Sequence, residues 1–90
     1  MWIINYRKTF LKELSKLPSD IQLKIEKLVF EKLVTDNPFE SGYFEKMKGY
    51  PDKYKIRIGD YRIGITIDSK KKEIVCERIA HRKDIYKLFP

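Results

Sequence analysis

This chain of 90 residues is poor in cysteine, histidine and long apolar segments, and each scarcity excludes a class of protein. Cys76 alone cannot form an internal disulfide, so nothing predicts a disulfide-stabilised secreted domain. One histidine and one cysteine make no metal-ligand cluster, and we expect no metal or cofactor. No apolar segment approaches the ~20 residues of a membrane span. The N-terminal MWIINYRKTF also lacks the features of a secretory signal, so we expect a cytoplasmic protein.

Glycine and proline are also scarce, with four of each, whereas aromatic residues make up 13% of the chain. This composition argues against disorder and favours a folded globular protein. A chain of this length has room for one small core. We therefore expect a single domain over residues 1–90.

Positive charge is unevenly distributed along the chain, whose formal net charge is +7. Residues 1–45 carry seven Lys/Arg and seven Asp/Glu, whereas residues 46–90 carry thirteen Lys/Arg and six Asp/Glu. The whole excess therefore lies in the second half. A one-sided excess of this kind favours a surface that binds a polyanion, although a solvated basic face that binds nothing has the same composition.

The first half of the chain has the pattern of a strand followed by two helices. Trp2–Tyr6 is apolar and β-prone. A first helix should begin at Phe10 with Thr9 as its cap, and should end before Pro18. Apolar residues at helical spacing predict a second helix over Ile21–Val34, with Ser19 as the candidate cap. The next residues, up to about Lys53, are predicted to form a loop.

The second half changes to a period of two, which indicates strands. Tyr54–Ile58 and Tyr61–Asp68 should form a hairpin around a type II′ turn at Gly59-Asp60, because glycine tolerates the positive φ of that turn. Glu73–Ala80 reads as a further strand of unclear register, and Arg82–Phe89 as a short terminal helix. The order β-α-α-β-β-β-α predicts an α+β fold, with an N-terminal helical hairpin packed on a small, mostly antiparallel sheet.

The hairpin is the most informative segment, because a two-residue turn fixes the strand register. Arg57 should lie opposite Arg62 and Lys55 opposite Gly64, with the intervening isoleucines facing the helices. Like charges opposite one another destabilise a sheet. We therefore expect the face that carries Lys55, Arg57 and Arg62 to be open and to hold an anion. A glycine inside a strand, as at Gly64, often marks a bulge or a place where a ligand approaches the backbone closely.

Three segments of the sequence resemble the RelE/ParE superfamily of type II toxins. The run Lys-x-x-Gly-x-x-Asp-x-Tyr-[Lys/Arg]-Ile-[Lys/Arg] is present at Lys46–Arg57, Gly-Asp-Tyr-Arg at Gly59–Arg62, and His-Arg-Lys-Asp-Ile-Tyr at His81–Tyr86. The strand and helices at the N-terminus fit the same family. The resemblance spans essentially the whole chain and implies a RelE-like fold.

The resemblance also implies the site residues. Carried over position by position, the catalytic residues would be Lys55, Arg57, Arg62, Arg82 and Tyr86. RNA contacts are expected from Lys46, Lys48, His81 and Lys83. The RelE pattern has a second lysine at the position of Arg57, and arginine does not lose its proton, so Arg57 is expected to clamp phosphate. Lys55 and Tyr86 remain the candidates for the base, and the single histidine is expected to contact substrate.

RelE-like toxins cleave mRNA in the ribosomal A site without a metal, by attack of a ribose 2′-OH on the adjacent phosphate. The resemblance therefore implies a ribosome-dependent endoribonuclease with a cognate antitoxin as partner. ParE-like members of the same superfamily instead inhibit DNA gyrase and have no nuclease activity, and that alternative stays open. A catalytically inactive relative that only binds its antitoxin or nucleic acid is a third reading.

Overall fold

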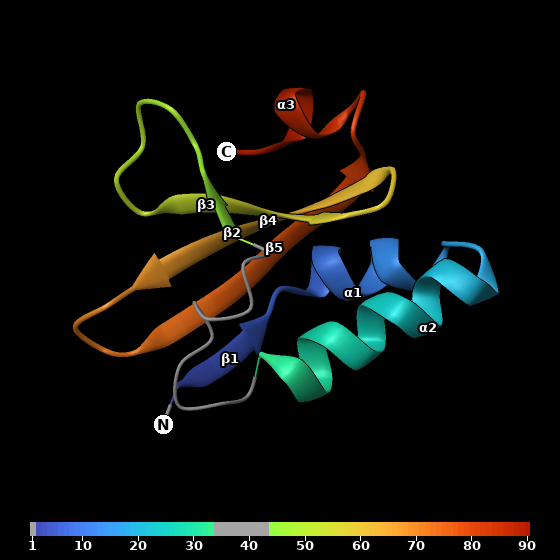
Figure 1. Ribbon diagram of the computed structural model, residues 1–90, viewed down its shortest axis with the longest axis horizontal. Coiled ribbons are helices and arrows are strands. Elements are labelled where there is room, and N and C mark those ends of the chain that lie inside the picture. The colour runs from blue at the N-terminus through green and yellow to red at the C-terminus, as the bar shows by residue number, and fades with distance from the viewer. Residues whose placement is uncertain (1, 34–43) are drawn as a thin grey trace.

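The computed structural model describes residues 2–33 and 44–90 (Figure 1). This part of the chain contains five strands and three α-helices, and a π-helical turn extends the second helix. The elements are β1 (Ile3–Tyr6), α1 (Lys8–Ser15), α2 (Ser19–Lys27), η1 (Leu28–Lys32), β2 (Phe44–Lys46), β3 (Lys53–Ile58), β4 (Tyr61–Asp68), β5 (Glu73–His81) and α3 (Ile85–Leu88).

The strands form one sheet in the order β1-β5-β4-β3-β2. β1 is parallel to β5, and the other neighbouring pairs are antiparallel. The predicted α+β class and the mostly antiparallel sheet are therefore confirmed. The sequence reading missed β2, which it placed in a loop. This strand has only three residues, Phe44–Lys46, too few to show an alternating pattern, and it pairs with Tyr54–Ile56.

Both predicted helix caps were wrong. α1 begins at Lys8, two residues before the predicted start, and α2 begins at Ser19 itself. The residues before them, Arg7 and Pro18, have extended backbones with ψ of 149° and 144°, and neither helix has a side-chain cap. The start of α1 is set by the sheet instead, because the Arg7 N–H donates to the Cys76 carbonyl of β5.

The second helix continues beyond α2 as the π-helical turn η1, in which the Leu33 N–H donates to the Leu28 carbonyl at 3.0 Å. Leu28, Val29 and Leu33 are all buried. The wider turn therefore keeps the apolar stripe against the core at the end of the helix. The predicted last residue, Val34, lies outside the described residues. No helix of the described part has the length and apolar character needed to cross a membrane.

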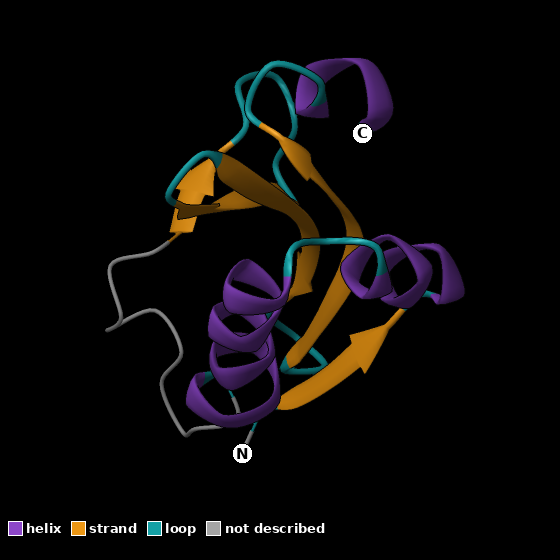
Figure 2. Ribbon diagram, turned by 90° about the vertical axis from the view of Figure 1, so that its right-hand side faces the viewer, coloured by secondary structure: helices purple, strands orange, loops and turns teal. Residues whose placement is uncertain are grey.

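The main core lies between the sheet and the two N-terminal helices (Figure 2). Isoleucines of β3, β4 and β5 meet Phe10, Leu14 and Ile25 there. Cys76 is buried in this core, and burial raises the pKa of its thiol to about 12. The Tyr6 hydroxyl donates to the Val29 carbonyl at 2.6 Å, which ties β1 to η1.

The opposite face of the sheet is partly covered, which corrects the prediction of an open face. Met47, Ile85 and Phe89 form a second, smaller core there, and Ala80 packs against it. The Phe89 ring lies over Gly64 so closely that a Cβ at this glycine would come within 2.4 Å of ring carbons. Gly64 therefore admits the C-terminal segment of the chain itself. The terminal helix is shorter than predicted, spanning Ile85–Leu88.

Candidate catalytic site and nucleic-acid interface

The β3–β4 hairpin has the predicted register. Arg57 pairs with Arg62, Lys55 with Gly64, and Ile58 with Tyr61. Gly59 has φ of +55°, and Lys72 is the only non-glycine residue with positive φ in the described part of the chain. A positive φ at the first turn residue followed by a negative φ at the second is the pattern of the predicted type II′ turn. The register places Lys55, Arg57 and Arg62 on the face opposite the main core.

Lys55 and Tyr86 contact each other directly. The Lys55 ammonium donates to the Tyr86 hydroxyl and lies 4.3 Å from the centre of the ring. The Lys55 side chain is only 14% exposed, whereas Tyr86 is 65% exposed. The lysine therefore approaches from within the sheet, and the phenol covers it from the solvent side. These two residues, both predicted catalytic, are 31 positions apart in sequence and are brought together by α3.

A hollow of about 390 Å³ surrounds this pair. Lys46 and Lys48 line it from the end of β2 and the loop that follows, and Phe89 and Pro90 line it from the C-terminus. Both lysines are exposed, and the described residues provide no ion-pair partner for either. The predicted RNA contacts Lys46 and Lys48 thus share one basic hollow with the predicted catalytic pair.

Arg62 and Arg82 gather at the β3–β4 turn. Arg62 donates to the Gly59 and Tyr61 carbonyls at 2.7 and 2.9 Å. The Arg82 N–H donates to the Asp60 carbonyl at 2.8 Å, and its guanidinium lies 3.9 Å from the Asp60 carboxylate. Both arginines are therefore held by the turn. Each guanidinium has five donors, so most of the donors remain available for an anion.

Arg57 lies opposite Arg62 in the strand register. Its side chain is exposed and forms no ion pair with any described residue. It does not line the hollow of Lys55 and Tyr86, but lines another hollow between the hairpin and α2. The structure therefore divides the five predicted catalytic residues into three neighbouring groups along one hairpin.

His81 and Lys83 lie at the end of β5, beside the same turn. His81 pairs with Tyr61, and the two rings meet edge to face with centres 5.8 Å apart. The His81 Nδ1 accepts the Lys83 N–H at 3.2 Å. The imidazole is thus oriented by its neighbours, while Lys83 is exposed and extends the basic surface.

The sequence reading missed three carboxylates near the site. The Glu45 carboxylate lies 3.9 Å from the Lys55 ammonium, across the β2–β3 pair. Glu13 of α1 accepts three hydrogen bonds from Arg78 and one from the Ile79 N–H, and the contact with Arg78 raises the pKa of that guanidinium. The contact of Glu45 with Lys55 could be predicted only by recognising the strand β2. The contact of Glu13 with Arg78 could be predicted only by knowing which way the Arg78 side chain points.

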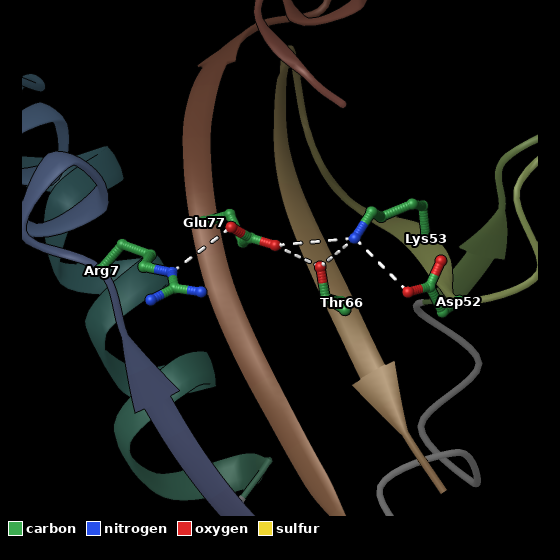
Figure 3. Close-up of polar contacts among 5 residues, drawn as sticks. All are labelled: Arg7, Asp52, Lys53, Thr66 and Glu77. Carbon is green, nitrogen blue, oxygen red and sulfur yellow. Dashed lines mark hydrogen bonds and ion pairs between the residues drawn. The ribbon is translucent and has the colours of Figure 1, made fainter.

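The third carboxylate, Glu77, belongs to a polar network across the sheet (Figure 3). A register shift at Gly64/Ile65 leaves Glu77 without a partner on β4. Its carboxylate accepts the Thr66 hydroxyl and lies 3.4 Å from Arg7 Nε and 4.0 Å from Lys53 Nζ. Lys53 Nζ also donates to Thr66 Oγ1 at 3.0 Å and lies 3.5 Å from the Asp52 carboxylate. The bulge explains why the register of β5 could not be read from its alternation.

Comparison with known proteins identifies the family. The family model described as the ParE toxin of the type II toxin–antitoxin system parDE matches residues 4–86. The chain belongs to the RelE/ParE superfamily of type II toxins. Toxin RelE3 of Methanocaldococcus jannaschii is 39% identical over 87 residues, which cover 94% of this chain and 96% of that protein. The resemblance found in the sequence is thereby confirmed.

Solved structures agree with this RelE/ParE assignment. A crystal structure of a RelB-RelE antitoxin-toxin complex from Methanococcus jannaschii contains a chain 34% identical to this one. The match has a TM-score of 0.77 and covers 96% of this chain and 99% of that chain. The toxin-antitoxin complex RelBE2 from Mycobacterium tuberculosis matches with a TM-score of 0.73 at 24% identity, over 92% of this chain and 93% of that one, and shows the fold alone.

Proposed function

We propose that this RelE-family toxin is a ribosome-dependent endoribonuclease that cleaves mRNA in the A site and so inhibits translation. The observation that carries the proposal is the contact between Lys55 and Tyr86 inside a hollow lined by further lysines. A phenol in contact with an ammonium is a pair of proton-transferring groups, and the surrounding cations match a phosphodiester. A surface that only bound another protein would not need this arrangement.

The reaction would use the 2′-OH of the substrate itself. Its oxygen bonds to the adjacent phosphorus, the bond from phosphorus to the 5′ oxygen breaks, and the products are a 2′,3′-cyclic phosphate and a free 5′-OH. A base accepts the 2′ proton, and an acid donates a proton to the leaving 5′ oxygen. Lys55 and Tyr86 are the candidates for these two transfers, because they share one hydrogen bond and border the hollow.

The arginines would stabilise the charge that develops on the phosphorane. Planar guanidinium groups match phosphate oxygens in pairs. Arg62 is preorganised by its two bonds to the turn carbonyls, and Arg82 by its contact with Asp60. Arg57 faces Arg62 across the hairpin and keeps its proton, so its role is to clamp phosphate. Lys46, Lys48, His81 and Lys83 would position the RNA strand around this centre.

The domain of residues 1–90 would act in the cytoplasm, where ribosomes and mRNA are present. It would be held inactive by a cognate antitoxin that covers the basic surface. The matched structures from Methanococcus jannaschii and Mycobacterium tuberculosis are toxin–antitoxin complexes, which supports this partner. An acidic or amphipathic segment would suit the lysines around the hollow.

A second candidate function is inhibition of DNA gyrase without nuclease activity. It is favoured by the family model that matches the chain, whose description is that of a ParE toxin. Under this alternative, the Lys55–Tyr86 contact would serve binding or packing only. Replacing the tyrosine hydroxyl would then leave toxicity unchanged.

The test is expression in cells, with cleavage sites in mRNA mapped by primer extension. Cleavage in phase with codons, lost in Tyr86→Phe and retained in Tyr54→Phe, is expected. Tyr54 is a suitable control because it lies on β3 and packs against the main core. Intact mRNA together with an induced DNA-damage response would refute the nuclease and support the gyrase alternative.

A further inference from the structure

A second basic hollow, of about 340 Å³, lies between the α2–η1 segment and the β3–β4 hairpin. Residues of α2 and η1 line one side of it, and Arg57, Ile58 and Gly59 line the other. Its described lining contains no acidic residue. The cations that line it are Lys24, Lys27, Lys32 and Arg57.

These four cations have no acidic partner among the described residues, where every ion pair involves other groups. Two acids of the same helical segment line a different hollow. Glu26 and Glu31 do so together with Leu23, Phe30 and Lys27, so Lys27 borders both hollows. Glu26 also accepts a hydrogen bond from Gln22. Four like charges around one depression raise the local potential, and an anion in the depression relieves their repulsion.

The spacing of the lysines suits a chain of phosphates. Lys24 and Lys32 are eight residues apart, which corresponds to about 12 Å along a helix. Over about 12 Å along the axis of a DNA duplex, one of its strands carries three or four phosphates. A line of separate cations therefore fits an extended polyanion better than a single small anion.

We propose that this hollow, the α2 cleft, binds the sugar–phosphate backbone of a nucleic-acid strand. Arg57 connects it to the candidate catalytic site, because Arg57 lines the cleft and also pairs with Arg62 across the hairpin. The strand would continue from the hollow of Lys55 and Tyr86, past the hairpin, onto the helix. The identification of that strand as the RNA substrate rests on the proposed function, whereas the cleft itself does not.

Binding can be measured separately from cleavage with a 2′-O-methyl RNA oligonucleotide, which lacks the hydroxyl that the proposed reaction needs. Fluorescence anisotropy over a series of NaCl concentrations gives the affinity and its salt dependence. The variant Lys24→Gln/Lys27→Gln/Lys32→Gln should lower the magnitude of the slope of log K against log [salt] by about 2, because each contact to a single strand contributes about 0.7. At low salt its affinity should fall at least tenfold.

The matched control is Lys8→Gln/Lys12→Gln/Lys16→Gln, which removes the same charge from exposed positions on and just after α1, outside the cleft. It should retain most of the slope and affinity. An equal loss of affinity and slope in both triple variants would mean that net charge alone causes the effect, and would overturn the proposal. An unchanged slope in the cleft variant would overturn it as well. A Lys→Arg triple variant at the cleft should bind like the parent and show that charge is what matters.

Two further measurements separate the remaining explanations. Thermal unfolding followed by circular dichroism should give similar midpoints for all variants, since the substituted lysines are exposed. A poly-glutamate probe tests for a protein ligand, and a cleft variant that lost this probe but kept the oligonucleotide would refute the assignment to nucleic acid. Failure of the cleavage test with a positive binding test would reject the nuclease and leave the cleft in place.

Discussion

The two ends of the sheet face opposite the main core both carry charged side chains but use them differently. At one end, Lys53 and Arg7 are engaged by Glu77, Thr66 and Asp52, and we call this group the paired end. At the other, the basic end, the cations exceed the acids. It consists of Lys46, Lys48, Lys55, Arg57, Arg62 and Arg82, together with Tyr86.

The two ends differ in whether their cations are neutralised by acids. At the paired end, the network joins β3, β4 and β5 to Arg7 at the start of α1, and no excess charge is left for a ligand (Figure 3). At the basic end, the contacts orient the cations without neutralising most of them. Arg62 is held by two backbone carbonyls, whereas Lys55 contacts the Tyr86 hydroxyl and lies 3.9 Å from the Glu45 carboxylate. Cations that are fixed but not neutralised are what a phosphate site requires.

The largest expected effect is the loss of cleavage when a lysine of the basic end is replaced, compared with the replacement of a lysine of the paired end. Lys55→Met should lower the rate of mRNA cleavage by about 10²–10⁴-fold, the range for loss of an acid or base. Lys53→Met, two residues away on the same strand and face, should lower it less than about threefold, because Lys53 is already engaged by the paired end. The measurement is single-turnover cleavage on programmed ribosomes.

Equal losses in the two lysine variants would remove the distinction between the ends. Circular dichroism is the control for folding, since both substitutions keep an unbranched side chain of similar length. Binding to the ribosome, measured by co-sedimentation, should survive Lys55→Met. A loss of cleavage explained entirely by lost binding would assign Lys55 to RNA contact instead of proton transfer.

The second prediction concerns Gly64 and Phe89, whose contact lies between the two ends. In Gly64→Ala the new methyl group would come within 2.4 Å of the Phe89 ring, so the C-terminal segment must shift. We expect a stability loss of about 1–3 kcal/mol, as for other overpacked sites. Cleavage should fall by about tenfold or more, because Tyr86 lies three residues before Phe89. Urea unfolding and the cleavage assay measure the two effects.

A double variant shows whether the steric contact is the cause. Phe89→Leu in the Gly64→Ala background removes ring atoms that the methyl group would meet, and should recover part of both losses. A purely additive result would mean that Gly64 is needed for some other reason.

The geometry of the candidate site was predictable from the sequence wherever one short turn controlled it. Gly59-Asp60 fixed the pairing of Arg57 with Arg62, and the alternation of isoleucines fixed which face was buried. Contacts between segments that are distant in the sequence were harder to predict. The resemblance selected both Lys55 and Tyr86, but only the fold shows that they touch. The strand β2 was too short to detect, so the neighbour of Lys55 on it, Glu45, was missed as well.

The remaining errors have the same origin. The face was predicted to be open because nothing in the local pattern places Phe89 over Gly64. Thr9 and Ser19 are good capping residues, but a backbone bond to the sheet sets the start of α1, and Pro18 occupies the position before α2, which begins at Ser19. For the sheet face and for α1, local preference gave way to contacts between segments that are far apart in the sequence.

The third prediction concerns Glu13, whose carboxylate holds Arg78 between the two ends of the face. Glu13→Gln keeps the shape but loses the charge, so the hydrogen bonds with Arg78 and the Ile79 N–H should weaken. We expect a loss of about 1–3 kcal/mol in the free energy of unfolding, measured in urea. Cleavage per folded molecule should stay within about twofold. A large activity loss in a stable variant would extend the functional surface to α1.

The smallest effect is expected at the paired end itself. Glu77→Gln removes the acid that Arg7 and Lys53 share, and the change in unfolding free energy should be below about 1 kcal/mol, because partly exposed ion pairs contribute little. Cleavage should be unchanged. The freed cations should, however, raise the magnitude of the salt slope for 2′-O-methyl RNA by up to about 1, since a released lysine or arginine can contact a phosphate.

Glu77→Gln thereby tests whether neutralisation is what limits RNA binding to the basic end. Glu73→Gln is its control, because Glu73 lies on the same strand and its carboxylate accepts a hydrogen bond from Asn5 without pairing with a cation. Both variants raise the formal net charge by one, so only a local effect can separate them. A larger slope in Glu77→Gln alone would show that Glu77 masks Arg7 and Lys53. Identical slopes would mean that the end of the RNA surface is set by shape, and that the C-terminal segment at Phe89 is the barrier.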